Sequence, residues 1–191
     1  KKSLLMVKGV NLNPTRTGAL DVLIQMGAQI EIHNQRVSCG EEVGDLHVRS
    51  SSLKNVTIAG EMIPRLIDEL PILALAGACS EGEMIVKDAQ ELRVKETDRI
   101  KAICSELRKV GVKIEEREDG FVIAGVPTCR RADVSTFNQK RFTSYGDHRL
   151  AMMEYVAGLV LDHPTEIDDV DCIKTSFPNF FELIGKTNKT N

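Results

Sequence analysis

The stretch Glu83-Met84-Ile85-Val86-Lys87 decides the fold, because it repeats Leu4-Leu5-Met6-Val7-Lys8 from the start of the chain. Both are short apolar runs typical of a strand. A second match joins Leu23–Ile30 to Leu107–Ile114. A chain that repeats itself in this way is built from one structural unit used more than once.

The two copies differ in the loop after their first strand. Matched positions lie further apart after this loop than before it, because the second copy holds five more residues there. The enlarged loop carries the run Lys95-Glu96-Thr97-Asp98-Arg99. A solvated helix start, with its acids placed favourably for the helix dipole, is one explanation of such a run. Because the loop is enlarged in only one copy, we favour a functional role for this run of charged residues.

Local signals place the elements of the first copy. Asn13 is a favourable N-cap and Pro14 a favourable first helical residue. They predict a helix that runs to Met26 and ends at Gly27, a natural C-cap. A strand is expected over 28–32.

The second copy follows the same order. Its helix is expected to end at Gly111, and a strand to follow over 112–116. The dipeptide Asp119-Gly120 is a strong hairpin turn signal, and the returning strand is expected over 121–123.

A second kind of helix also repeats, since Leu75-Ala76-Gly77 matches Val156-Ala157-Gly158. Both segments are almost wholly apolar, which marks buried helices, and the Ala-Gly pair permits close approach of a neighbour. With a third strand expected over 165–169, the unit is used at least twice and partly a third time. The pattern predicts an α+β fold of repeated βαβαββ units, a prism-like arrangement with buried helices and outer sheets.

Charged residues stand at equivalent places in these copies. Asp68 and the triplet Asp147-His148-Arg149 open the two buried helices. Lys95 and Lys174 lie in loops after equivalent strands, so pseudo-symmetry would bring all these loops to one end of the domain. Plainer explanations exist, since an acid in a first helical turn suits the helix dipole and a single lysine is usually solvated. Together, however, carboxylates beside cations favour acid–base chemistry on a small anionic substrate.

Composition narrows the class of protein. The chain has 191 residues, 42% of them hydrophobic, and a net charge of −3 with no long basic run, which argues against nucleic-acid binding. The four histidines are scattered and no HExxH or Cys/His cluster occurs, so no metal site is expected. No apolar run approaches the roughly 18–20 residues of a membrane span, and no signal peptide is visible. We therefore expect no membrane association and a cytoplasmic location, with the five cysteines as free thiols.

Four motifs resemble the EPSP synthase (3-phosphoshikimate 1-carboxyvinyltransferase) family, and the match runs in order along almost the whole chain, from about Ser3 to Ile184. The most specific is Leu92-Arg93-Val94-Lys95-Glu96-Thr97-Asp98-Arg99. The others are Tyr145-Gly146-Asp147-His148-Arg149-Leu150-Ala151-Met152, Lys174-Thr175-Ser176-Phe177-Pro178, and Asp68 within Leu66-Ile67-Asp68-Glu69-Leu70-Pro71. The family transfers the carboxyvinyl group of phosphoenolpyruvate to the 5-hydroxyl of shikimate 3-phosphate and releases phosphate, on the route to chorismate and aromatic amino acids.

The resemblance implies a role for each matched residue. Asp68 is similar to the proton acceptor that contacts the shikimate hydroxyls, and Glu96 to the acid that protonates the phosphoenolpyruvate methylene. His148 is similar to a supporting residue of the catalytic group. The remaining cations resemble substrate-binding residues: Lys95 for shikimate 3-phosphate, and Arg99, Arg149 and Lys174 for the carboxylate and phosphate of phosphoenolpyruvate. No metal or organic cofactor is implied.

The resemblance also implies a domain organisation. Family members have two domains of three βαβαββ units each, closing around the substrates. Residues 1–191 would be most of the C-terminal-containing domain, with the partner domain absent and the whole enzyme a monomer. This chain alone would then be inactive or nearly so. The alternatives are a UDP-N-acetylglucosamine 1-carboxyvinyltransferase, against which the 95–99 and 147–149 motifs argue, and a non-catalytic domain that binds phosphate esters.

Overall fold

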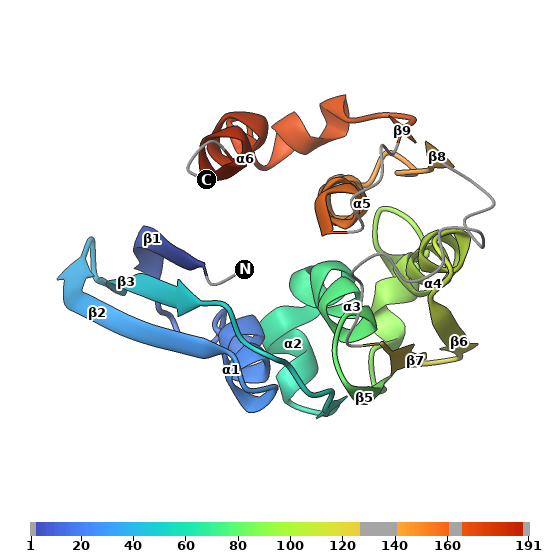
Figure 1. Cartoon of the computed structure of the whole chain (residues 1–191), viewed down its shortest axis with the longest axis horizontal. Helices are drawn as coiled ribbons and strands as arrows, with labels where there is room; N and C mark the ends of the chain where they lie inside the picture. Colours follow the sequence, from blue (N-terminus) through green and yellow to red (C-terminus); the bar gives the residue numbers. More distant parts are fainter. Residues whose placement is uncertain (1–2, 127–140, 161–165, 189–191) are drawn as a thin grey trace.

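The described residues form three sheets and a set of helices, which Figure 1 shows in their arrangement. The computed structural model describes residues 3–126, 141–160 and 166–188, and the side chains up to residue 185. The elements, in chain order, are β1 (Leu4–Asn11), α1 (Gly18–Gln25), β2 (Gln29–Ser38), β3 (Glu41–Arg49), β4 (Thr57–Ile58), α2 (Met62–Leu66), η1 (Ile67–Glu69), α3 (Leu70–Ala78), β5 (Gly82–Val86), η2 (Gln90–Val94), α4 (Arg99–Lys109), β6 (Lys113–Arg117), β7 (Gly120–Gly125), β8 (Arg141–Phe142), α5 (His148–Val160), β9 (Glu166–Ile167), η4 (Asp171–Thr175) and α6 (Phe180–Asn188), where η marks a 3₁₀ turn.

The predicted βαβαββ unit is present in full as β4–α3–β5–α4–β6–β7. Its four strands form one sheet in the order β4-β5-β7-β6, with β4 parallel to β5 and the other neighbours antiparallel. The first sheet, β1-β3-β2, has the same order as β5-β7-β6. The pair β8 and β9 is parallel, as β4 and β5 are. The repeat seen in the sequence is therefore confirmed as a repeat of structure.

Burial was predicted for both apolar helices, and it is confirmed for α3, whereas α5 is buried only in part, with five of its 13 residues buried. Seven of the nine residues of α3 are buried, and α3 packs against α5, with α4 in contact with both. Figure 1 shows α3 and α5 side by side, with the β4-β5-β7-β6 sheet beyond them. Gly77 allows β5 to approach α3 closely, because a Cβ atom there would lie only 2.6 Å from the Sδ atom of Met84.

The start of α1 differs from the prediction. The helix begins at Gly18 rather than Pro14, because Asn13 forms a local turn in which its Oδ1 accepts from the backbone N–H of Thr15 at 3.0 Å. A Cβ atom on Gly18 would lie 2.9 Å from the backbone of Arg65, so this glycine allows the start of α1 to approach α2. The predicted end is confirmed, since Gly27 has a φ of 96°.

The strand and turn predictions are confirmed with small shifts. The strand expected over 28–32 continues to Ser38 as β2, and the predicted hairpin joins β6 to β7, with its turn at Glu118-Asp119 and Gly120 already in β7. Of the strand expected over 165–169, only Glu166–Ile167 forms β9, and residue 165 lies outside the described residues. Within the described ranges, no helix has the length and apolar character needed to cross a membrane.

Candidate active site

A buried arginine joins three carboxylates from three parts of the chain. Arg99 is the first residue of α4, and its side chain is 1% exposed. Its Nε donates to Asp147 Oδ2 at 2.7 Å and its Nη1 to Asp68 Oδ1 at 3.0 Å. Its Nη2 donates to Glu96 Oε2 at 2.6 Å. Two predicted catalytic carboxylates, Asp68 and Glu96, are thus held on one guanidinium group.

Asp98 and Asp147 fix the starts of the helices that meet here. Asp98 caps α4, since its Oδ1 accepts from the backbone N–H of Lys101 at 3.0 Å. Asp147 is fully buried, and its Oδ1 accepts from the backbone N–H of Arg149 at 2.8 Å at the start of α5. A buried ion pair is tolerated only when its remaining polar atoms also find partners. Asp147 meets this condition by serving Arg99 and the helix terminus together.

Asp68 is surrounded by cations. It lies in η1, immediately before α3, and its Oδ2 is 3.5 Å from Arg149 Nη2 and 3.6 Å from Arg16 Nη2. Partial burial opposes the charged form, but the charge of Arg149, the hydrogen bond from Arg99 and the charge of Arg16 outweigh it and lower the pKa of Asp68. Asp68 is therefore ionised at neutral pH, as a carboxylate that accepts a proton must be.

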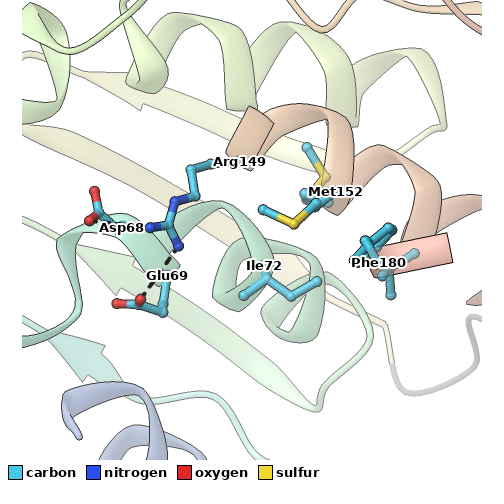
Figure 2. Close-up of a pocket in the computed structure, with 8 residues that line it drawn as sticks. Asp68, Glu69, Ile72, Arg149, Met152 and Phe180 are labelled. Carbon is cyan, nitrogen blue, oxygen red and sulfur yellow. Dashed lines mark ion pairs between the residues drawn. The ribbon is translucent and has the colours of Figure 1, made fainter. Parts of the chain in front are cut away.

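A pocket of about 170 Å³ opens beside this cluster, between η1–α3, α5 and the start of α6 (Figure 2). One end is charged, where Glu69 Oε1 lies 3.7 Å from Arg149 Nη1. The opposite wall is apolar. The lining residues are Asp68, Glu69, Ile72, Arg149, Met152, Met153, Val156 and Phe180. The pocket is therefore divided into a charged end, which holds two carboxylates and one guanidinium group, and an apolar wall.

His148 supports Arg149. Arg149 Nε donates to His148 Nε2 at 3.1 Å, so this ring nitrogen acts as an acceptor. The contact orients the guanidinium of Arg149 toward Asp68 and Glu69.

The two predicted lysines lie apart from the Arg99 cluster. Lys95 Nζ is 2.9 Å from Glu91 Oε1, and Lys174 Nζ is 2.6 Å from Asp171 Oδ1. These are their ion pairs within the described part of the chain, and the side chain of Lys174 is 64% exposed. Of the predicted site residues, the structure thus brings together Asp68, Glu96, Arg99, His148 and Arg149, and leaves the lysines at neighbouring loops.

The described residues contain no group of three or more His, Cys, Asp or Glu side chains suited to hold a metal ion.

Comparison with known proteins settles the family. A family model described as EPSP synthase (3-phosphoshikimate 1-carboxyvinyltransferase) matches residues 1–184. The chain belongs to the EPSP synthase family.

Relatives named 3-phosphoshikimate 1-carboxyvinyltransferase agree. The one from Petrotoga mobilis is 52% identical over 186 residues, which cover 97% of this chain and 41% of the relative. The one from Roseiflexus castenholzii is 53% identical over 182 residues, covering 95% of this chain and 40% of the relative. This chain therefore spans about two fifths of the length of these EPSP synthases.

Solved structures agree on the fold. An EPSP synthase from Acinetobacter baumannii superposes with a TM-score of 0.89 at 36% identity, over 97% of this chain and 42% of the other. The enolpyruvyl transferase NikO from Streptomyces tendae superposes with a TM-score of 0.64 at 16% identity, over 96% of this chain and 38% of the other, and supports the fold alone. The predicted enolpyruvyl transferase-like fold is confirmed.

The sequence patterns assigned no role to three charged residues at this candidate site. Asp147 was visible in its motif and as a helix cap. Arg16 could have been found from the repeat, because it lies in the loop after β1 as Lys95 lies in the loop after β5. Arg93 was visible in its motif, but its role was not, because its partners Asp98 and Glu116 come together only through packing of η2 against the β6–β7 hairpin.

Proposed function

We propose that this chain is the C-terminal-containing part of a two-domain EPSP synthase. The whole enzyme would transfer the carboxyvinyl group of phosphoenolpyruvate to the 5-hydroxyl of shikimate 3-phosphate, giving 5-enolpyruvylshikimate 3-phosphate and phosphate. Family membership and the pocket beside Asp68 support this reaction. A monomeric, cytoplasmic enzyme with an intramolecular partner domain is part of the same proposal.

The observation that carries the proposal is the attachment of Asp68 and Glu96 to one buried guanidinium. Arg99 holds Asp68 at 3.0 Å and Glu96 at 2.6 Å. Enolpyruvyl transfer needs one group that takes a proton from the attacking hydroxyl and another that gives a proton to carbon. Two carboxylates fixed on different nitrogens of a rigid, planar group meet this requirement, because their separation cannot change freely.

Asp68 and Glu96 carry out the proton transfers. Asp68, ionised in the resting site, takes the proton of the 5-hydroxyl as that oxygen attacks C2 of phosphoenolpyruvate. Glu96 must carry a proton for the next step, in which it gives that proton to the methylene carbon C3, which becomes a methyl group. Return of one methyl proton to Glu96 and loss of phosphate from C2, which takes the proton held by Asp68, then restore the double bond and both side chains, so bonds and protons balance.

The cations divide between the substrates' anionic groups. Arg149 already faces Asp68 and Glu69 across distances of 3.5 and 3.7 Å, too long for strong hydrogen bonds, so its donors can turn to a phosphate or carboxylate. Arg99 is bound to three carboxylates, so it would offer the substrates only a remaining Nη1 donor at the edge of the site. Lys95 lies before α4 and Lys174 in η4, and both would complete the clamp when the partner domain closes.

The test is phosphate release by the full-length enzyme, meaning this chain joined to the preceding part of its own protein or of the Petrotoga mobilis relative. Release from phosphoenolpyruvate with shikimate 3-phosphate is expected, and none with UDP-N-acetylglucosamine. The chain alone is expected to show little or no turnover, because contacts from the partner domain are missing. Turnover with UDP-N-acetylglucosamine, or with neither acceptor, would overturn the proposal.

A further inference from the structure

Each repeat carries a basic residue in the loop after its equivalent strand. These loops are residues 12–17 after β1, 87–98 after β5 and 168–179 after β9. They contain Arg16, Lys95 and Lys174, respectively. The resemblance to EPSP synthases gives substrate-binding roles to the two lysines only, and leaves Arg16 without a role.

The loop that carries Arg16 is rigidly built. Asn11 Oδ1 accepts from the backbone N–H of Asn13 at 2.7 Å, and the Asn13 carbonyl accepts from the backbone N–H of Arg16 at 2.8 Å. Arg65 Nε, from α2, donates to the Pro14 carbonyl at 2.7 Å. These contacts fix the backbone at Arg16, and with it the point from which the side chain extends.

The side chain of Arg16 reaches the proposed site and keeps its donors accessible. Its Nη2 lies 3.6 Å from Asp68 Oδ2 and 3.5 Å from Glu69 Oε1, while 48% of the side chain is exposed. These distances are longer than those of strong charge-assisted hydrogen bonds. Arg99, in contrast, is 1% exposed and occupied by three carboxylates.

The charges at the pocket mouth suggest a role for Arg16. Asp68 and Glu69 both face the pocket, and Glu69 Oε2 is buried with no hydrogen-bond partner among the described residues. Two carboxylates at a pocket mouth repel an incoming phosphate or carboxylate unless cations compensate them. Arg16 and Arg149 contact the same two carboxylates, so an anion entering here would meet two guanidinium groups.

We propose that Arg16 is a further substrate-binding residue, which takes a phosphate or carboxylate group of one of the two substrates. The proposal rests on the proposed function, because it names an additional contact in the same site. It would give each of the three repeats one cation for the bound anions. The competing role is that of a fixed counter-ion for Asp68 and Glu69, which would change the chemical step rather than substrate binding.

The experiment separates these roles by steady-state kinetics of the full-length enzyme. Arg16→Gln is compared with Arg16→Lys and with the control Arg117→Gln. Arg117 is matched to Arg16, since its side chain is also 48% exposed and its ion pair with Glu115 is also long, at 3.5 Å, but it lies on β6. The KM for each substrate, the inhibition constant of inorganic phosphate and kcat are measured for every variant.

The expected result is a rise of about 10- to 100-fold in KM for one substrate in Arg16→Gln, with kcat changed less than about threefold. Arg16→Lys should recover part of the loss, and Arg117→Gln should match the unsubstituted enzyme. A parallel loss of phosphate inhibition would assign Arg16 to a phosphate group, and unchanged inhibition to a carboxylate.

Unchanged KM values for both substrates, or a fall in kcat alone, would overturn the assignment. Failure of the proposed function looks different, because the unsubstituted enzyme itself would then release no phosphate. In that case calorimetric titration of unsubstituted and Arg16→Gln protein with shikimate 3-phosphate and with phosphoenolpyruvate decides the question. Equal affinities in the two proteins, or binding by neither, would overturn it.

Discussion

Arg99 Nε lies 2.7 Å from Asp147 Oδ2, and both side chains are almost completely removed from solvent. The pair joins the first residue of α4 to the residue that caps α5. It also carries Asp68 and Glu96, because both of these carboxylates bind the same guanidinium. The positions of Glu96, the proposed acid, and Asp68, the proposed base, therefore depend on the contact between Arg99 and Asp147.

Asp147→Asn should destabilise the protein by about 3–5 kcal/mol, because it removes one charge of a buried pair and leaves the other less compensated. Asparagine is also a good N-cap, so the variant keeps the cap of α5. The loss of stability therefore reports the missing charge alone. The free energy of unfolding in urea measures the effect. The exposed ion pair of Asp171 with Lys174 provides the control, and Asp171→Asn should leave stability within error. Equal stabilities of the two variants would contradict the role of the buried pair.

Asp68→Asn should lower kcat of the full-length enzyme by a factor of roughly 10² to 10⁴, because the amide cannot accept the hydroxyl proton. The side chain keeps its shape and its contact with Arg99, so the fold should persist. Rapid-quench measurement of the first turnover reads the chemical step directly. Near-normal turnover would remove Asp68 from the proposed role.

Glu96→Gln should reduce turnover by a similar factor while leaving substrate binding largely intact, because the proton donated to carbon is lost but the anion-binding cations remain. Turnover and calorimetric affinity for shikimate 3-phosphate are the two measurements. Glu83→Gln, at an exposed position of β5, is the control. Loss of affinity in proportion to the loss of turnover would instead indicate a binding role.

Arg93→Gln should loosen the loop that carries Lys95 and Glu96. Arg93 Nη1 donates to Asp98 Oδ2 at 2.8 Å and to Glu116 Oε1 at 3.0 Å, which closes the base of this loop against the β6–β7 hairpin. We expect faster hydrogen exchange at the amides of residues 95–98 and a fall in kcat/KM of about 10-fold or more.

Arg117→Gln on the same hairpin is the control for this change and should alter neither quantity. Unchanged amide exchange in Arg93→Gln would show that the loop holds its shape without the arginine.

Glu154→Gln should stabilise the protein at alkaline pH. Glu154 is fully buried in α5 and neither carboxylate oxygen has a partner among the described residues. Burial, then the carboxylates of Glu106 and Asp168, raise its pKa to about 9, with Asp147 adding to the shift and Lys109 opposing it. The folded protein keeps this proton where the unfolded chain, with an ordinary pKa of 4.5, releases it.

The contribution of Glu154 to stability is therefore complete below pH 4.5 and is lost as the pH rises toward 9. Urea unfolding between pH 5 and pH 8.5 should show a shallower decline for Glu154→Gln, with a gain of at least about 1 kcal/mol at the alkaline end. Exposed Glu83→Gln should keep the slope of the unsubstituted protein. An equally steep decline in Glu154→Gln would show that this group does not hold the proton.

Much of the fold was readable from the sequence, because its signals are local or periodic. The strand repeats, the apolar character of α3 and α5 and the Asp119-Gly120 hairpin all depend on near neighbours in the chain. The start of α1 was predicted wrongly because that prediction also used only local signals. Asn13 and Pro14 favour a helix locally, but the contacts of the 12–17 loop with Arg65 delay it to Gly18.

The sequence by itself determined the repeated unit, the family motifs and most of the residues of the candidate site. Tertiary structure alone decided which charges meet: Arg99 with Asp147, 48 positions away, Arg16 with Glu69, 53 positions away, and Arg93 with Glu116, 23 positions away. Side-chain pairing over such separations follows from the packing of helix starts and hairpins against one another. That packing is a property of the assembled core, and no local pattern of residues encodes it.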